Sequence, residues 1–208
     1  MLNPDLLQRM CNEVYQHGYS IVPNALPLPL CQALLSESKQ AQLQRAGVGR
    51  AEAHTRNAEI RHDFIAWIDR TDGAQGQWLN CAAALQTEVN RRLLLGLFSF
   101  ESHFAVYEPG AFYKKHVDAF RGQANRVLSL VAYLNPEWSA ADEGEMVLYS
   151  NADEHLEIAR VQPRMGTLAI FLSEEFPHEV RPAKRTRYSI AGWYRVNASN
   201  HNRVDPPQ

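Results

Sequence analysis

The chain has 208 residues, of which 45% are hydrophobic, 21% charged and 10% aromatic. This length suits a single domain, with enough apolar material for a sizeable core. A formal net charge of -2 argues against a nucleic-acid partner held by a broad basic surface. No apolar run approaches the roughly 20 residues that a membrane-spanning helix needs, so we expect no membrane partner.

The start of the sequence and its cysteines indicate the compartment. Residues 1–5 lack the basic and then apolar layout of a signal peptide. Cys11, Cys31 and Cys81 are odd in number and widely spaced, which implies neither a disulfide framework nor a thiolate zinc site. We therefore expect a cytoplasmic protein.

The first part of the chain is expected to be mainly helical. Apolar residues at a period near 3.6 predict helices over residues 4–17, 28–45 and 75–95. Short strands are expected over 18–22 and 64–67, the second inside a polar excursion that spans 47–72. Residues 1–97 are thus predicted to form a helical support and a substrate-loop region.

After Gly96 the hydrophobic period changes to two, which is typical of strands. The expected strands are residues 102–107, 127–134, 145–149, 166–172 and 187–196. Short strands after helices indicate an α+β, mainly β fold, an antiparallel barrel or sandwich backed by N-terminal helices. We predict one domain over 1–208, with a β core over 98–196 and a disordered polar tail over 197–208.

A metal site is predicted from two histidines and an aspartate. Asp118 follows His116 by two positions, so on an extended strand both side chains point to the same side. His178 comes after three further predicted strands, which can return the chain to the same barrel mouth. Two imidazoles and one carboxylate form the facial triad of non-haem iron(II) oxygenases. For each of the other six histidines, a surface or hydrogen-bonded role is expected.

Arg187 begins the strand after His178, and period two places it on one face with Ser189, Ala191 and Trp193. An arginine directed into a barrel needs an anion, because an unpaired buried charge is very costly. A dicarboxylate co-substrate would accept a two-pronged hydrogen bond from the guanidinium. The alternative is an ion pair with a carboxylate of the protein.

Five segments carry a family resemblance: residues 60–68, 107–118, 127–135, 177–180 and 187–194. They resemble the 2-oxoglutarate-dependent dioxygenases, and most closely the prolyl hydroxylase branch that includes the hypoxia-factor enzymes and their bacterial relatives. The resemblance covers about residues 10–196. It implies a double-stranded β-helix, or jelly roll.

The resemblance also implies a role for individual residues. His116, Asp118 and His178 would bind Fe(II). Arg187 and the Tyr133 hydroxyl would hold the distal carboxylate of 2-oxoglutarate, while O2 takes the open metal position. The alternative for Tyr133 is an ordinary strand tyrosine with its hydroxyl in water.

Further candidates come from the same motifs. Ser189 is placed with the co-substrate residues, Tyr107 over the metal mouth and Trp193 in the wall near the substrate. For Tyr107 and Trp193, plain aromatic core is the alternative. Two departures from the family pattern are expected to change details. Many relatives have a Gly-Gly pair before the fourth strand, where this chain has Glu143-Gly144-Glu145. Ala191 stands where some have a threonine that helps to hold 2-oxoglutarate.

Three charged residues are candidates for binding the substrate. Arg61, Asp63 and Arg126 occupy positions that resemble the border of the peptide groove in prolyl hydroxylases. We predict that Asp63 and Arg126 pair across this groove and help to close the loop. Solvated surface charges are the alternative.

The function implied by the resemblance is an iron(II)- and 2-oxoglutarate-dependent hydroxylase that acts on a prolyl residue of a protein. It would release succinate and CO2, and ascorbate could stimulate it. Two alternatives stay open: the same chemistry on another residue or a small metabolite, and a non-catalytic jelly roll that binds a metal or a metabolite.

Overall fold

The computed structural model describes residues 2–47, 60–119 and 125–198. Its helices are α1 (Pro4–His17), α2 (Leu28–Gln40) and α3 (Gly73–Leu93). The ends of α1 follow from its sequence. The Asn3 side chain accepts a hydrogen bond from the backbone N–H of Asp5, and Gly18 takes the left-handed conformation, φ 78°, that ends the helix.

Eleven strands form two antiparallel sheets within the described residues. The large sheet has the order β1-β9-β6-β11-β4-β3-β2, and the small sheet has the order β5-β10-β7-β8. The strands are β1 (Tyr19–Val22), β2 (Gln44–Arg45), β3 (Phe64–Trp67), β4 (Ser99–Tyr107), β5 (Tyr113–His116), β6 (Arg126–Tyr133), β7 (Met146–Tyr149), β8 (Glu157–Val161), β9 (Leu168–Leu172), β10 (His178–Val180) and β11 (Arg187–Arg195). This mainly β architecture confirms the expected fold class.

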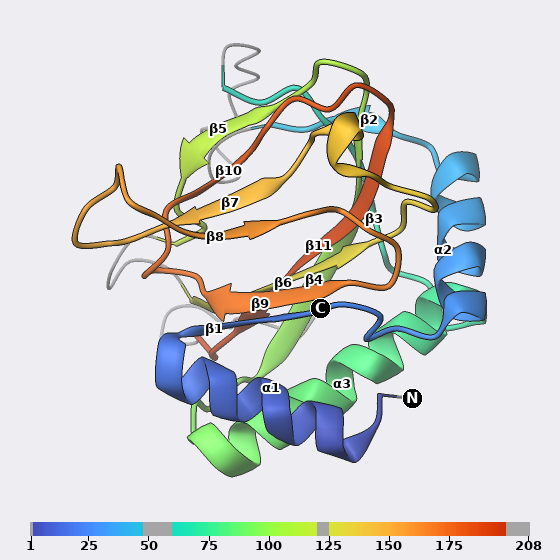
Figure 1. The fold of residues 1–208 in the computed structure, drawn as a ribbon. Coiled ribbons are helices and arrows are strands. Elements are labelled where there is room, and N and C mark those ends of the chain that lie inside the picture. Colours follow the sequence, from blue (N-terminus) through green and yellow to red (C-terminus); the bar gives the residue numbers. More distant parts are fainter. Residues whose placement is uncertain (1, 48–59, 120–124, 199–208) are drawn as a thin grey trace.

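The molecule has three layers, because α1 and α3 cover one face of the large sheet and the small sheet lies over the other, while α2 stands at the side (Figure 1). Strand β6 shows how the sequence divides between them. Leu128 and Leu130 belong to the core shared with the helices, whereas Tyr133 packs with Met146 and Phe171 between the sheets. The alternation of a strand's side chains therefore directs one set of residues toward the helices and the other into the barrel.

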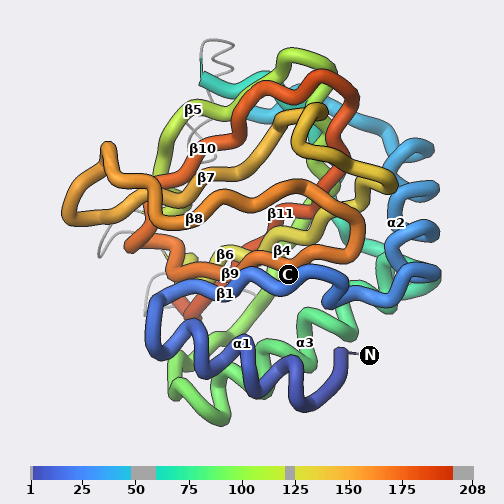
Figure 2. Tube along the Cα trace, in the orientation of Figure 1, coloured from blue at the N-terminus to red at the C-terminus, as the bar shows by residue number. Residues whose placement is uncertain are grey.

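Segments far apart in the sequence lie side by side, as the colours of Figure 2 show for β1 and β9. The same is true of β5 and β10, which pair so that His178 lies opposite His116. Two histidines separated by several strands are thereby brought to one end of the small sheet.

The structure corrects several predicted boundaries. The second helix ends at Gln40 rather than Arg45, because Ala41 is extended, ψ 147°, and residues 44–45 pair with β3 instead. Strands β5, β8 and β10 had no counterpart in the prediction. They are short, and pairing within the small sheet, rather than local periodicity, makes them strands.

No helix in the described ranges combines the length and the apolar character needed to cross a bilayer. Part of the polar excursion, residues 48–59, and most of the predicted tail, residues 199–208, lie outside the residues that the structure describes.

Candidate metal and co-substrate site

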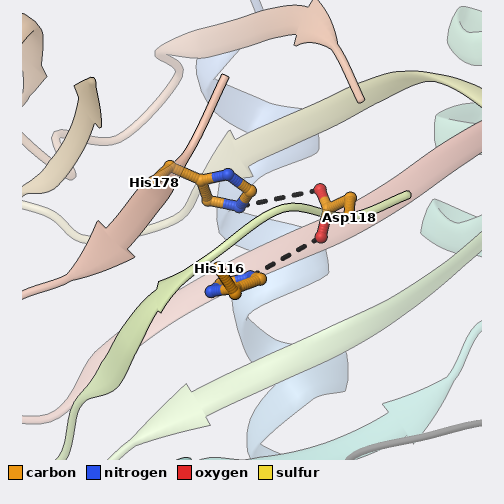
Figure 3. Close-up of side chains that lie close together, drawn as sticks. All are labelled: His116, Asp118 and His178. Atoms are coloured by element: carbon orange, nitrogen blue, oxygen red, sulfur yellow. Dashed lines mark ion pairs between the residues drawn. The ribbon is translucent and has the colours of Figure 1, made fainter. Parts of the chain in front are cut away.

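His116, Asp118 and His178 converge at one end of the small sheet (Figure 3). His116 ends β5, Asp118 lies in the bend that follows it, and His178 begins β10. The Nε2 atoms of His116 and His178 each lie 3.6 Å from a different oxygen of Asp118. One ligand atom from each residue can be chosen so that all three lie within 4.8 Å of one another. One ion could therefore contact all three groups.

Backbone carbonyls orient both imidazoles. His116 Nδ1 lies 2.8 Å from the Lys114 carbonyl oxygen, and His178 Nδ1 lies 3.0 Å from that of Phe176. A carbonyl only accepts, so in each ring Nδ1 carries the proton and Nε2 keeps its lone pair. Such contacts fix the tautomer and the ring orientation of a metal ligand.

The carboxylate of Asp118 is held by a relay of hydroxyl groups. The Ser129 hydroxyl donates to Asp118 Oδ2 at 2.6 Å, and it lies 2.9 Å from the Ser173 hydroxyl. Burial alone would raise the pKa of Asp118, but the neighbouring His178 and His116 rings and the Ser129 hydroxyl hold that pKa well below its ordinary value. Burial and the nearby His116 lower the pKa of His178 to about 4. At neutral pH the site thus presents one negative carboxylate and an uncharged His178.

The donor set fits iron(II). Two imidazole nitrogens and one carboxylate oxygen on a single face leave the remaining positions open for other ligands. Sequence reasoning did not name Ser129 as a site residue, although period two places it on the face of Tyr133. It also missed Tyr113, whose ring stacks on that of His116 at 3.6 Å between centroids.

Arg187 lies deep in the barrel and is only 1% exposed. Its Nε donates to the Gly144 carbonyl at 3.0 Å, and its Nη1 donates to the Ser189 hydroxyl at 3.1 Å. No carboxylate among the described residues lies within ion-pair distance of its guanidinium. A buried cation of this kind favours an anionic ligand beside it.

Two buried tyrosines flank this guanidinium. Its carbon lies 5.0 Å from the ring centre of Tyr107 and 5.1 Å from that of Tyr133. Burial raises the pKa of Tyr133 to about 12, and it also raises that of Tyr107. Both hydroxyls therefore keep their protons, and the Tyr133 hydroxyl, which donates to the Met146 sulfur at 3.6 Å, could turn to a carboxylate instead.

The predicted pairing of Asp63 with Arg126 is wrong. Arg61 holds Asp63 with two hydrogen bonds of 2.5 and 2.8 Å, and it lies over the Tyr113 ring at 4.7 Å. Arg126 instead donates to Glu101, at 2.7 Å from Nη2 and 3.0 Å from Nε. The reason is proximity, because Arg61 lies two residues from Asp63 and satisfies both of its oxygens.

The remaining predicted residues lie on the inner face of β11. Trp193 is buried, and the guanidinium of Arg126 covers its ring at 3.8 Å. Ala191 lies between His103 of β4 and Val131 of β6. Its methyl group cannot donate the hydrogen bond that a threonine would offer.

Several known proteins are similar to this chain in sequence. The family model described as "2OG-Fe(II) oxygenase superfamily" matches residues 102–195. Prolyl hydroxylase EGLN3 of Mus musculus is 36% identical over 196 residues, which cover 87% of this chain and 80% of that relative. Egl nine homolog 1 of Homo sapiens is 36% identical over 145 residues, and there the match spans only 33% of the relative's length.

Two solved structures are also similar. A Pseudomonas putida prolyl-4-hydroxylase superimposes with a TM-score of 0.81 at 38% identity. The match covers 92% of this chain and 100% of that chain. A Trichoplax adhaerens prolyl hydroxylase, solved with a hypoxia inducible factor peptide fragment, gives a TM-score of 0.79 at 28% identity over 92% of this chain and 89% of that one. The chain belongs to the 2OG-Fe(II) oxygenase superfamily. That family uses Fe(II), 2-oxoglutarate and O2, and its members with prolyl hydroxylase activity are among the relatives of this chain.

Proposed function

We propose that this protein is an iron(II)- and 2-oxoglutarate-dependent hydroxylase that acts on a prolyl residue of a protein. One observation carries the proposal. A His-Asp-His triad with open coordination positions shares a barrel with a buried arginine that has no carboxylate partner among the described residues. The site can thus hold a metal ion and a separate anion. A hydroxylase that uses Fe(II) and the dicarboxylate 2-oxoglutarate needs both.

The chain's own residues would bind, orient and shield the reactants. His116, Asp118 and His178 would hold Fe(II), and Arg187 would neutralise the distal carboxylate of 2-oxoglutarate. The protonated Tyr133 hydroxyl would donate a further hydrogen bond to it. When bound, Fe(II) and 2-oxoglutarate supply oxidative decarboxylation with O2, which yields succinate and CO2 and places one oxygen atom on the substrate.

Several residues around this site would keep the geometry fixed. Ser189 and the Gly144 carbonyl occupy two donor nitrogens of Arg187, so its direction is set before the co-substrate arrives. Ser129 would do the same for the Asp118 carboxylate. Preorganisation of this kind lowers the cost of reaching the reactive arrangement.

A protein substrate is supported by the relatives. The relatives named above are called prolyl hydroxylases or Egl nine homologues, and one similar structure holds a peptide fragment. We infer that this chain likewise accepts a peptide segment with a target proline. We also propose that it forms one domain, since one buried cluster joins the helices to the large sheet and a second joins the large sheet to the small sheet. The cytoplasmic location stays a prediction, with which the free thiols of Cys11, Cys31 and Cys81 agree.

The test is a mass-spectrometric assay. The purified protein is incubated with Fe(II), ascorbate, 2-oxoglutarate and a library of proline-containing peptides, and succinate release is followed in parallel. We expect a gain of one oxygen on proline in a subset of peptides, together with one succinate for each product. Asp118→Ala serves as the inactive control.

The other outcomes separate the alternatives. Oxygen gained on another residue, or on members of a small-molecule library only, would replace prolyl hydroxylation by a related oxygenation. Iron and 2-oxoglutarate binding without succinate release under any of these conditions would identify a non-catalytic binder.

A further inference from the structure

Glu101 is the centre of a charge cluster on the large sheet. Its carboxylate accepts two hydrogen bonds from Arg126, and Arg195 lies 3.5 Å from it. These three residues come from three neighbouring strands, β4, β6 and β11. Neither the sequence patterns nor the family resemblance gave Glu101 a role.

The cluster has an unusual span. In the large sheet β11 lies between β6 and β4, so the ion pair of Arg126 with Glu101 joins strands that are not neighbours. Two strand spacings amount to roughly 10 Å, which only long side chains can bridge. The residue of β11 opposite Glu101 is Trp193. The ion pair therefore crosses over Trp193, and the Arg126 guanidinium lies 3.8 Å above the indole ring.

Trp193 is in turn close to the metal site. Its partner in β6 is Ser129, the residue that donates to the metal-site carboxylate of Asp118. The indole Nε1 of Trp193 is buried and has no hydrogen-bond acceptor among the described residues. An unpaired buried donor lowers the stability of the folded state. A ligand that brings an acceptor to this position would relieve that cost.

We propose that Glu101 is a positioning residue of the substrate groove. It holds Arg126 flat on Trp193, which fixes the indole in the orientation that offers its free N–H to a carbonyl oxygen of the bound peptide. Arg195 supports the same carboxylate from β11. This inference rests on the proposed function, because it assigns to the groove the peptide that a prolyl hydroxylase would bind.

Glu101→Gln tests the inference, since it keeps the shape of the side chain and removes its charge. The matched control is Glu88→Gln. Glu88 also binds two arginines, accepting from Arg91 at 2.6 Å and from Arg92, but it lies on the remote helix α3. Thermal unfolding of both variants monitors the fold.

The first readout is the environment of Trp193. The protein is labelled with 5-fluorotryptophan, and Trp193→Phe identifies the fluorine NMR signal of this residue among the four tryptophans. Glu101→Gln is expected to shift and broaden that signal, because the Arg126 guanidinium is then no longer held over the indole ring. Glu88→Gln should leave it unchanged.

The second readout is kinetic and uses a proline peptide that the wild type hydroxylates. Loss of one charge-assisted contact predicts a KM for the peptide that is about tenfold higher in Glu101→Gln. The kcat and the 2-oxoglutarate requirement should stay within about twofold, since neither the metal nor Arg187 is touched. Combining Glu101→Gln with Arg126→Gln should cost little more than either change alone.

Each contrary result has a definite meaning. An unmoved Trp193 signal, or a moved signal with an unchanged peptide KM, overturns the positioning role. Peptide KM and 2-oxoglutarate requirement rising together would indicate general damage to the site and also overturn it. A wild type that hydroxylates no peptide overturns the proposed function instead, and the fluorine signal then decides alone whether Glu101 fixes Trp193.

Discussion

Arg187 has a guanidinium geometry that a lysine cannot reproduce, because a lysine ammonium is a point charge without the planar fork. Arg187→Lys should therefore raise the 2-oxoglutarate concentration for half-maximal succinate release by about tenfold or more. Arg187→Met should raise it further, since the buried carboxylate then loses its counter-charge. Titrating 2-oxoglutarate in the succinate assay gives both values. Arg164→Met, at an exposed position, is the control. Equal 2-oxoglutarate requirements in all variants would remove Arg187 from the site.

Asp118 is the only carboxylate in the triad. Asp118→Ala removes one ligand and the single negative charge of the site, so we expect iron binding to fall to background and turnover to vanish. The iron content of the purified protein, measured by atomic emission, checks this directly. His155→Ala removes an exposed histidine and should retain full iron content. Normal iron content in Asp118→Ala would contradict the assignment of the metal site.

A substitution of Ser129 tests how a metal ligand is oriented without removing any ligand. Ser129→Ala leaves all three ligands in place but removes the hydroxyl that donates to Asp118 at 2.6 Å. Loss of such an outer contact typically lowers metal affinity by about 10- to 100-fold. Competition for Fe(II) against a chelator of known affinity measures the change. Ser129→Thr, which keeps a hydroxyl, should recover part of it, and an affinity equal to wild type in Ser129→Ala would show that the hydrogen bond does not orient the ligand.

At the scale of elements, the turn between the 3-10 helix Ala140–Asp142 and β7 is strained. Glu143 has φ 56° and ψ -148°, a region that is almost restricted to glycine. Gly144 follows with φ 77°, and a Cβ there would lie 2.6 Å from the Ala183 Cβ. This turn also delivers the Gly144 carbonyl to Arg187, so the departure from a Gly-Gly pair leaves the Arg187 contact intact at a cost in stability.

Relief of that strain gives a prediction. Glu143→Gly should stabilise the protein by about 1 kcal/mol, because the strain of 1 to 3 kcal/mol outweighs the greater chain entropy of glycine and one exposed ion pair. Urea unfolding measures the difference. Lys184→Gln removes the same ion pair without changing the backbone and should have little effect. A destabilised Glu143→Gly would mean that the side chain, rather than the backbone, matters at this turn.

Elements with a strong local signal could be predicted from the sequence, and elements defined by pairing could not. Helix α1 has a capping asparagine, a 3.6-residue period and a terminal glycine, and its predicted bounds are confirmed. Strand β10 has three residues, His178–Val180, which carry no periodicity of their own. It is a strand because β5 and β7 pair with it on either side.

Among the site residues, too, some could be predicted from the sequence and others could not. His116, Asp118 and His178 could be predicted because few side chains bind iron and their spacing suits one face. The partner of Arg126 could not, because both candidates are acidic: Asp63 lies just before β3, and Glu101 lies in the neighbouring strand β4. Only the structure shows that Arg61 already forms hydrogen bonds with the Asp63 carboxylate. The Arg126 side chain instead extends across β11 and pairs with Glu101.

For the whole molecule, the space between the sheets holds uncharged histidines as well as charged groups. His103 of β4 is buried, its Nδ1 lies 3.0 Å from the Phe104 carbonyl oxygen, and its ring packs against Trp67 and Trp193. Burial, together with the positive charge of Arg61, lowers the pKa of His103 to about 4. An unfolded histidine has a pKa near 6.5. Between pH 6.5 and pH 4, His103 therefore binds a proton in the unfolded chain but stays neutral in the folded protein.

This difference makes the folded protein less stable as the pH falls from 6.5 toward 4, by about 2 kcal/mol from His103 by pH 4.5. His103→Met, which replaces the ring with an uncharged side chain, should lose less stability over this range than the wild type. Urea unfolding of the metal-free proteins at pH 7, 5.5 and 4.5 measures the two slopes. The lowered pKa of His178 acts in the same direction in both proteins, so it cancels from the comparison. His155→Gln, at an exposed position, should follow the wild type. Parallel curves for His103→Met and the wild type would show that His103 does not stay neutral in the folded barrel.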